Sequence, residues 1–274
     1  MPKKRTRTKP KKPRYTAKTA DRHVLYQLSV QDAETEARFL DRVFRKITGR
    51  VPTSLREDFC GTALLCAEWA KKRDRTAVGI DLDKSVLAWG TEHNLKPIGE
   101  PGNRVTLLRQ DVRDRVPGHF DITVALNFSY FIFQSRDLLR EYFASVHRSV
   151  AKGGLFVLDA YGGYESWKPV EEPRRLSGFT YVWDQAEVYP IENRVVNHIH
   201  FEFPNGSKMK NAFTYDWRLW TLPEITEVLA EAGFSRSAVY WESADAKGEG
   251  TGVFRPKTGV AQEAAWIVYI IAER

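Results

Sequence analysis

Cysteine is scarce in this sequence, and long apolar runs are missing from it. The 274 residues include two cysteines, Cys60 and Cys66, and their positions on one predicted turn and helix do not suit a disulfide. No run of about eighteen apolar residues is present to span a membrane. The N-terminus also has no apolar stretch typical of a secretory signal. We therefore expect a soluble protein of a reducing compartment, the cytoplasm.

Excess positive charge is missing from most of the chain, although the whole sequence carries a net charge of +7. Residues 1–22 contain ten Lys or Arg and one acid, Asp21, so residues 23–274 carry a net charge of −2. The prolines and the self-repulsion of residues 1–22 predict a disordered basic tail. Such a tail promotes solubility, makes weak non-specific contact with a polyanion such as nucleic acid, or serves as a targeting segment.

Short apolar segments alternate with amphipathic ones over the first 160 residues. Helical periodicity predicts helices at residues 29–47, 63–71, 84–93 and 136–150. Five apolar segments between turn residues predict buried strands at residues 53–59, 76–80, 105–108, 122–126 and 155–158. This alternation is typical of a doubly wound α/β domain with a mostly parallel sheet.

The pattern changes after residue 159. Alternating segments at residues 179–188, 195–203 and 208–217 predict an antiparallel β-meander, inserted at about residues 164–217 of a domain that spans residues 23–274. A helix at residues 223–232 and strands at 237–241 and 265–271 follow, with a Gly-rich loop at 243–262. The complete prediction is a doubly wound, mostly parallel, seven-stranded sheet with an antiparallel edge strand.

Polar or small residues follow each of the first four predicted strands. The carboxyl ends of parallel strands meet at one edge of a sheet, where ligands of doubly wound folds bind. An acid about twenty residues beyond a glycine turn is placed to bind ribose hydroxyls, although a single acid after a strand can also be a helix cap. As a set, these residues predict a site for an adenosine-containing cofactor, made by Glu57, Cys60, Gly61, Thr62, Asp81, Leu82, Asp111, Val112 and Asn127.

The dinucleotide fingerprint G-x-G-x-x-G is missing, because the first turn offers only Gly61. The turn at residues 60–62, followed by Asp81 and Asp111, instead resembles the class I S-adenosylmethionine-dependent methyltransferases, and the resemblance extends over residues 25–272. It implies S-adenosylmethionine as the cofactor. The acid of the first strand would then neighbour the methionine amino group, the second acid would hold the ribose, and the third would lie beside the adenine.

The first strand departs from the family pattern. In the family an apolar strand usually ends in two or more glycines, whereas residues 55–59 here read Leu-Arg-Glu-Asp-Phe. Either Glu57 or Asp58 can supply the family's acid. Counting back from Cys60 favours Glu57.

The methyl acceptor is expected above the ends of the fourth and fifth strands, under a lid made by the meander and the loop 243–262. Methyl transfer needs alignment of the two reactants, exclusion of water, and a base when the acceptor carries a proton. Many aromatic residues of the meander are expected to form its own core. The candidate catalytic residues are Tyr130, Asp159, Tyr161 and His198.

No metal site is expected. His198, His200 and Glu202 alternate on one strand face, a spacing that can ligate a metal, but a solvent-facing strand explains the same pattern. The family's Asn-Pro-Pro-aromatic signature for methylation of base amino groups is missing, because Phe128 follows Asn127.

Two functions follow from these patterns. The first is O- or N-methylation of a small molecule in an enclosed aromatic pocket, which the near-neutral folded part favours. The second is a methyltransferase directed at RNA or protein that recruits its substrate through the basic N-terminal tail. A cofactor-binding scaffold without methyl transfer has no feature in its favour. The acceptor and the oligomeric state are not set by these patterns.

Overall fold

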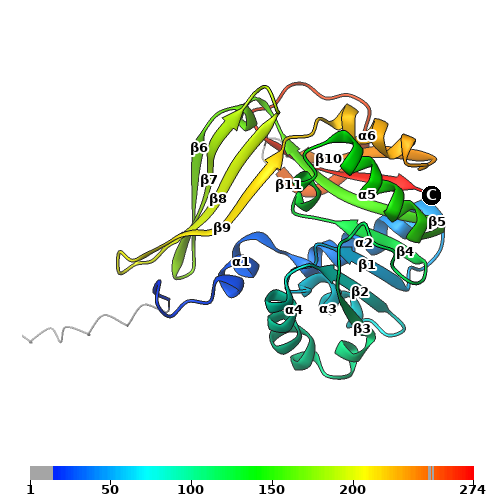
Figure 1. The fold of residues 1–274 in the computed structure, drawn as a ribbon, viewed down its shortest axis with the longest axis horizontal. Coiled ribbons are helices and arrows are strands. Elements are labelled where there is room, and N and C mark those ends of the chain that lie inside the picture. The colour runs from blue at the N-terminus through cyan, green and yellow to red at the C-terminus, as the bar shows by residue number, and fades with distance from the viewer. Residues whose placement is uncertain (1–14, 246–247, 249) are drawn as a thin grey trace, which may run out of the picture.

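The computed structural model describes residues 15–245, 248 and 250–274. An eight-stranded sheet with helices on both faces forms one part of the molecule, and a four-stranded antiparallel sheet stands beside it (Figure 1). The predicted α/β architecture with an added antiparallel sheet is confirmed.

The large sheet contains the five predicted parallel strands. Its order is β11-β10-β12-β5-β4-β1-β2-β3, and the three strands at the β11 end run antiparallel to their neighbours. These strands are β1 (Ser54–Asp58), β2 (Thr76–Asp81), β3 (Val105–Arg109), β4 (Phe120–Ala125), β5 (Val150–Gly162), β10 (Arg236–Ala244), β11 (Gly250–Lys257) and β12 (Trp266–Glu273).

The large sheet has eight strands, one more than the sequence predicts, and the additional strand is β11. It lies within the segment expected as a Gly-rich loop and pairs only with β10 among the described residues. Most of its residues are exposed. An edge strand of this kind has no alternation of buried and exposed residues, so its sequence lacks the signal that identifies a half-buried strand.

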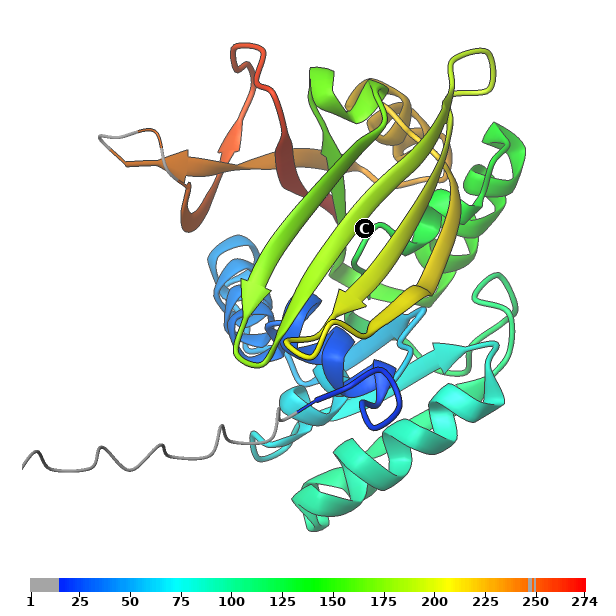
Figure 2. The same cartoon turned by 90° about the vertical axis from the view of Figure 1, so that its left-hand side faces the viewer.

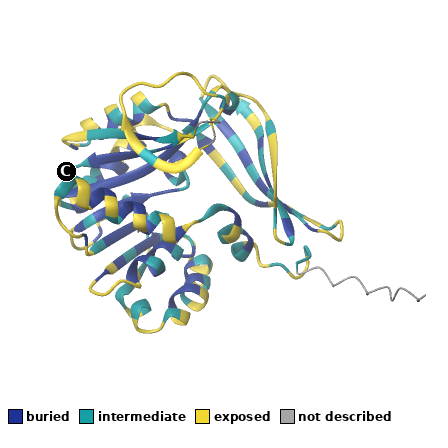
Figure 3. Ribbon diagram, turned by 180° about the vertical axis from the view of Figure 1, so that it is seen from behind, coloured by how far each residue is buried: buried dark blue, intermediate teal, exposed yellow. Residues whose placement is uncertain are grey.

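Helices pack on both faces of the large sheet. Helices α2 (Ala33–Thr48), α3 (Leu64–Ala70) and α4 (Lys84–Gly90) contribute to the core on one face. Helices α5 (Arg136–Ser149) and α6 (Leu222–Glu231) contribute to the core on the other. Figure 3 shows the central strands of this sheet as mostly buried and the outer faces of the helices as largely exposed. No helix of residues 15–245 and 250–274 is long and apolar enough to cross a bilayer.

Helix α2 starts later than its sequence pattern predicts. Asp32 caps its first turn by accepting a hydrogen bond from the Thr35 amide (3.2 Å), and Gly49, with φ +71°, ends it. The residues before this cap form a separate helix, α1 (Arg22–Val30), so the periodicity that begins near Ser29 spans two helices.

The four-stranded sheet has the order β6-β7-β8-β9. Its strands are β6 (Val170–Leu176), β7 (Phe179–Tyr189), β8 (Arg194–Glu202) and β9 (Lys208–Arg218). Strand β6 is not among the three strands that the sequence predicts for the meander. It is a charged, largely exposed edge strand that contains Pro173, and proline is tolerated in strands mainly at edges.

Helix α1 and the residues before it lie against the four-stranded sheet, at its lower end in Figure 2. Tyr15 meets Phe179 edge-to-face at 5.9 Å, the Ala17 amide donates to Ser207 Oγ (3.0 Å), and Leu25 is fully buried in the same cluster. Residues 15–22 therefore belong to the folded part, whereas residues 1–14 of the predicted tail lie outside the described residues. The boundary of the predicted tail moves to before residue 15.

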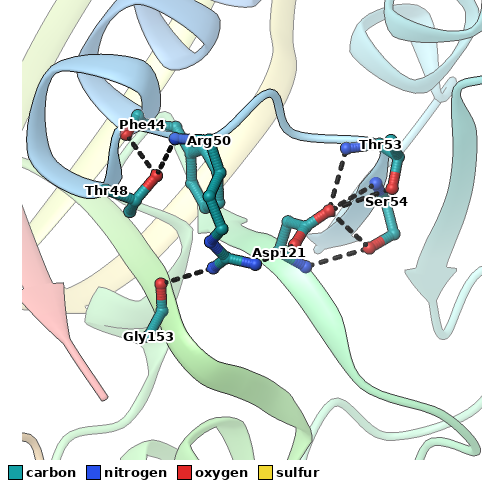
Figure 4. Close-up of polar contacts among 7 residues, drawn as sticks. All are labelled: Phe44, Thr48, Arg50, Thr53, Ser54, Asp121 and Gly153. Atoms are coloured by element: carbon teal, nitrogen blue, oxygen red, sulfur yellow. Dashed lines mark hydrogen bonds and ion pairs between the residues drawn. The ribbon is translucent and has the colours of Figure 1, made fainter.

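Polar contacts at the amino ends of β1 and β4 set the alignment of these two strands (Figure 4). Asp121 Oδ2 accepts hydrogen bonds from the backbone amides of Thr53 (2.8 Å) and Ser54 (3.2 Å) and from both hydroxyl groups. Arg50 lies 3.6 Å from the other carboxylate oxygen and donates to the Gly153 carbonyl (2.8 Å). These contacts anchor the edge of the sheet opposite to the one where the predicted site lies.

Candidate active site

The turn after β1 has an unusual backbone. Phe59, Gly61 and Ala63 all have positive φ, between +52° and +55°. Only glycine takes up this left-handed conformation without steric strain. The turn brings the Gly61 amide to Asp81 Oδ2 at the end of β2 (2.9 Å), so the carboxyl ends of two neighbouring strands are joined directly.

A cavity of about 490 Å³ opens beside this turn, and we call it the turn cavity. Six of the nine residues predicted to bind the cofactor line it: Glu57, Cys60, Gly61, Thr62, Asp81 and Asn127. The described residues that line it do not include Leu82, Asp111 or Val112. Their role as cofactor ligands stays a prediction.

Asp111 has a partner within its own loop. Arg113 donates to both of its carboxylate oxygens, at 3.0 and 2.8 Å, and this hydrogen bonding lowers the pKa of the Asp111 carboxyl. Val112 is buried, and its carbonyl accepts a hydrogen bond from Arg56 (2.8 Å). Leu82 is exposed. The loop after β3 is thus held in place by its own side chains.

Glu57 and Asp58 have different partners. Asp58 is buried in an ion pair with Arg56 (2.7 Å) and accepts a hydrogen bond from the Tyr142 hydroxyl (2.8 Å). Glu57 accepts one from the Cys66 amide at the start of α3 (3.0 Å). Burial, with repulsion by Asp81 and Asp58, raises the pKa of Glu57 to about 7. Glu57 is therefore the acid of this strand with fewer partners of its own.

A second cavity, of about 720 Å³, lies between the large sheet and the four-stranded sheet. We call it the aromatic cavity, because nine aromatic side chains line it: Tyr26, Phe128, Tyr161, Tyr181, Trp183, Tyr215, Trp217, Trp266 and Tyr269. Four carboxylates also line it, those of Glu36, Asp159, Glu172 and Glu242, against one cation, Arg174. Its walls are therefore mainly aromatic, with more acidic than basic side chains.

The two cavities adjoin. Tyr26, Asn127, Tyr215 and Trp217 line both of them. Tyr26 comes from α1, Asn127 follows β4, and the other two come from β9. A ligand in the turn cavity and a ligand in the aromatic cavity would meet at these four side chains.

Asp159 supports the backbone at this junction. Its carboxylate accepts hydrogen bonds from the amides of Asn127 and Phe128, both at 2.8 Å. These two residues have φ of +57° and +58°, a strained conformation for non-glycine residues that the paired acceptor holds in place. Burial raises the pKa of Asp159 to about 7, against the two hydrogen bonds, which lower it.

The structure separates the four predicted catalytic residues. Asp159 and Tyr161 line the aromatic cavity. Tyr130 is fully buried in the core, where its hydroxyl donates to the Asp159 carbonyl (2.8 Å). His198 bonds Thr214 (3.0 Å), and its strand alternates so that Asn197 and Ile199, not His198, are the buried neighbours. A catalytic role for Tyr130 or His198 stays a prediction that this geometry does not favour.

The three side chains whose spacing allowed a metal site have other partners. Both ring nitrogens of His200 are engaged, one with Asp184 (3.0 Å) and one with the Asn211 amide (2.8 Å), and Glu202 pairs with Lys208. Among the described residues, no group of three or more His, Cys, Asp or Glu side chains is placed to hold a metal.

Several cavity residues escape prediction from the sequence. Tyr26 belongs to α1, which the sequence pattern does not separate from α2. Tyr215 and Trp217 are among the many aromatic residues of the lid region, where the sequence does not distinguish cavity residues from core residues. The position of Glu36, by contrast, can be recognised in the sequence pattern. It lies three residues after Ala33 and four before Leu40, both buried, so an acid stands on the apolar face of an amphipathic helix.

Comparisons with known proteins agree with this geometry. Residues 58–158 match the family model of the methyltransferase domain. No curated protein sequence matches the chain. At the level of structure, an S-adenosylmethionine-dependent methyltransferase from Clostridium acetobutylicum has a TM-score of 0.68 and 15% identity over 92% of this chain and 96% of that chain.

Two further solved structures are similar. An amino pentose methyltransferase from Micromonospora echinaspora has a TM-score of 0.66 and 19% identity over 92% of this chain and 95% of that chain. A sugar N-methyltransferase from Streptoalloteichus has a TM-score of 0.63 and 17% identity over 100% of this chain and 98% of that chain. At these identities, the three similarities establish a shared fold.

Proposed function

We propose that the chain is a methyltransferase that uses S-adenosylmethionine and that it methylates an amine on a small molecule. The match of residues 58–158 to the family model of the methyltransferase domain supports the reaction. The family match and the similar structures support the cofactor and the class of reaction. The acceptor is the proposal, and the aromatic cavity supports it.

The turn cavity fits the cofactor. Gly61 has φ +52°, and a Cβ built on it would point toward Val86, another lining residue, at 3.9 Å, so the missing side chain leaves room for a ligand against the backbone. The carboxylates of Glu57 and Asp81 lie on the same wall. In this arrangement Asp81 would hold the ribose hydroxyls, and Glu57, through the turn, the methionine end. When bound, the cofactor supplies an electrophilic methyl group on a sulfonium.

The chain itself has to hold the acceptor in line with that methyl group and to exclude water. The four residues shared by the two cavities, Tyr26, Asn127, Tyr215 and Trp217, stand at the place where the reacting atoms would meet. The hydroxyl groups of Tyr26 and Tyr215 interact with each other. This pair joins α1 to β9 across the junction and would close it to solvent.

The observation that carries the proposal is the lining of the aromatic cavity, with nine aromatic rings, four carboxylates and one cation. The faces of aromatic rings and carboxylates both attract a cation. An aliphatic amine is protonated near neutral pH, so it would bind here more favourably than a neutral alcohol of the same shape. Two of the similar structures are named as an amino pentose methyltransferase and a sugar N-methyltransferase, which points the same way.

The test uses pairs of acceptors that differ only in the reacting group, such as glucosamine and glucose. The protein is incubated with S-adenosylmethionine and each member, and mass spectrometry follows the methylated product and S-adenosylhomocysteine. We expect the amine of a pair to be methylated and the alcohol not. Asp81→Ala is the matched variant for the cofactor site and should lose binding of S-adenosylhomocysteine.

Preferential methylation of the alcohols would overturn the amine assignment and leave the cofactor assignment intact. Failure of the wild-type protein to bind S-adenosylhomocysteine would overturn both. Methylation of total RNA or of protein, with no small amine accepted, would favour the second function that the sequence suggests.

A further inference from the structure

Glu36 stands where helix α2 faces the aromatic cavity. It is partly buried, and its helix otherwise presents Ala33, Ala37 and Leu40 on the same side. The acidic groups that repel its carboxylate most strongly are Glu57 of the turn cavity and Asp159 of the aromatic cavity. Glu36 therefore lines the aromatic cavity and interacts electrostatically with one acid of each cavity.

The other carboxylates of the aromatic cavity are engaged or exposed. Asp159 accepts two backbone amides of the strained turn. Glu242 accepts the Gly252 amide (2.6 Å), and Glu172 lies on the exposed edge strand β6. Glu36 has a backbone hydrogen bond with Asp32, but no cation of the described residues forms an ion pair with it. Of the four acids, Glu36 is the partly buried one that has neither an ion pair nor a hydrogen bond from another helix or strand among the described residues.

We infer that Glu36 binds the ammonium group of the methyl acceptor and takes its proton before methyl transfer. This inference rests on the proposed function, in which the acceptor is an amine. One N–H proton passes to the Glu36 carboxylate and leaves a neutral nitrogen. The nitrogen lone pair then forms the bond to the methyl carbon, and the electrons of the broken carbon–sulfur bond stay on sulfur. The methylated product carries the positive charge, and the proton on Glu36 returns to solvent.

The electrostatic surroundings of Glu36 suit this exchange. Burial, followed by repulsion from Glu57, Asp159 and Asp32, raises its pKa to about 8. The phenols of Tyr26 and Tyr269 also interact electrostatically with it, from α1 and β12. Amino groups have pKa values of about 8 to 10. The proton can therefore move between the amine and the carboxylate at little cost in free energy, the condition under which acid–base catalysis is efficient.

The first test needs no methyl acceptor. Wild-type protein labelled with ¹³C at the glutamate carboxyl carbons is titrated by NMR, with and without tetramethylammonium, a permanent cation that cannot be deprotonated. The Glu36 signal is assigned by its loss in Glu36→Gln. We expect a midpoint near pH 8 that tetramethylammonium lowers, because the cation stabilises the charged carboxylate. An unchanged midpoint would show that the carboxylate does not face a cation in the cavity and would overturn the inference.

The second test measures kcat/KM against pH for the fastest amine of the acceptor panel. Glu36→Gln should lose about 100-fold or more and should recover part of its rate toward high pH, where the free amine is already neutral. Glu36→Asp should restore part of the loss. Glu34→Gln, on the exposed side of the same helix, is the matched control and should keep the wild-type rate.

An unchanged pH profile in Glu36→Gln would overturn the role of Glu36 while the panel still supports amine methylation. If no amine of the panel is methylated, the proposed function fails. The tetramethylammonium titration then still decides whether Glu36 faces a bound cation.

Discussion

Two residues of the turn after β1, Phe59 and Ala63, have a left-handed backbone conformation that only glycine adopts without strain. Ala63 has φ +54° and is fully buried, at the N-terminal boundary of α3. A non-glycine residue in this conformation costs about 1 kcal/mol or more. The turn therefore has the backbone conformation of a glycine-rich turn, although Ala63 is not a glycine.

Replacing Ala63 by glycine should stabilise the protein. The substitution removes the left-handed strain but makes the unfolded chain more flexible, so a net gain of about 0.5 to 1 kcal/mol is expected in the free energy of unfolding. Urea denaturation measures it. Ala67→Gly, in the interior of α3, is the control and should lose about 1 kcal/mol. A loss of stability in Ala63→Gly would show that the methyl group contributes more by packing than the backbone loses by strain.

Glu36 should also affect stability in a pH-dependent way. Its pKa is raised on folding from 4.5 to about 8, so the folded protein binds this proton more tightly than the unfolded chain does. The stabilising contribution of the protonated group is complete below pH 4.5 and is lost as the pH rises through about 8.

Glu36→Gln should therefore differ least from wild type at low pH and become progressively more stable than wild type as the pH rises to about 8. Denaturant melts across this range, with Glu34→Gln as the exposed control, measure the difference. A constant difference between Glu36→Gln and wild type at all pH values would contradict the raised pKa.

Helix α1 joins the two sheets and contributes to the walls of both cavities. Arg22, His23 and Tyr26 line the turn cavity, and Gln27 Nε2 donates to Thr62 Oγ1 of the turn after β1 (2.8 Å). The same helix buries Leu25 against the four-stranded sheet. We infer that α1 closes the turn cavity and links it to the four-stranded sheet.

Removing the link between α1 and the turn should weaken cofactor binding. Gln27→Leu deletes one partly buried hydrogen bond, worth about 1 kcal/mol, and should raise the Kd for S-adenosylhomocysteine about fivefold in calorimetry. Leu28→Ala, on the exposed side of the same helix, is the control and should leave the Kd unchanged. Equal Kd values for Gln27→Leu and wild type would show that α1 does not stabilise the bound cofactor.

Edge elements were the ones that sequence patterns predicted least well. The buried strands β1, β2, β4 and β5 and the helices α2 and α5 follow from periodicity, because burial on a defined face forces apolar residues into a repeating pattern. Strands β6 and β11 lie at sheet edges and are mostly exposed. Their pairing is decided by the neighbouring strand, which leaves no period in their own sequence.

The charge of the whole molecule is concentrated at its N-terminus. Residues 1–14 contain eight Lys or Arg and no acid, so residues 15–274 carry a net charge of −1. The aromatic cavity adds local negative charge. A polyanion would therefore be attracted by the first fourteen residues and not by the acceptor site.

Deletion of residues 1–14 should separate the two functions that the sequence suggests. Methyl transfer to a small amine should be unchanged, whereas binding to heparin or RNA should be lost, because such contacts depend on clustered cations. Kinetic assays and binding at two salt concentrations measure both effects. The deletion must stop before Tyr15, which packs against Phe179. Loss of transfer to the small amine would contradict an acceptor site that works without the tail.

The sequence by itself determined the α/β sheet, the resemblance to methyltransferases and the turn residues Glu57, Gly61 and Asp81, because these depend on local periodicity and on strand ends that meet at one edge. Only the tertiary structure decided what the acceptor would meet. Tyr26 and Glu36 come from the first two helices, and Trp217 comes from β9, about 180 residues further along the chain. Asp111 follows its strand as predicted, but its carboxylate pairs with Arg113. Whether a side chain faces a cavity, a salt-bridge partner or solvent depends on contacts between distant segments, and local sequence does not encode these contacts.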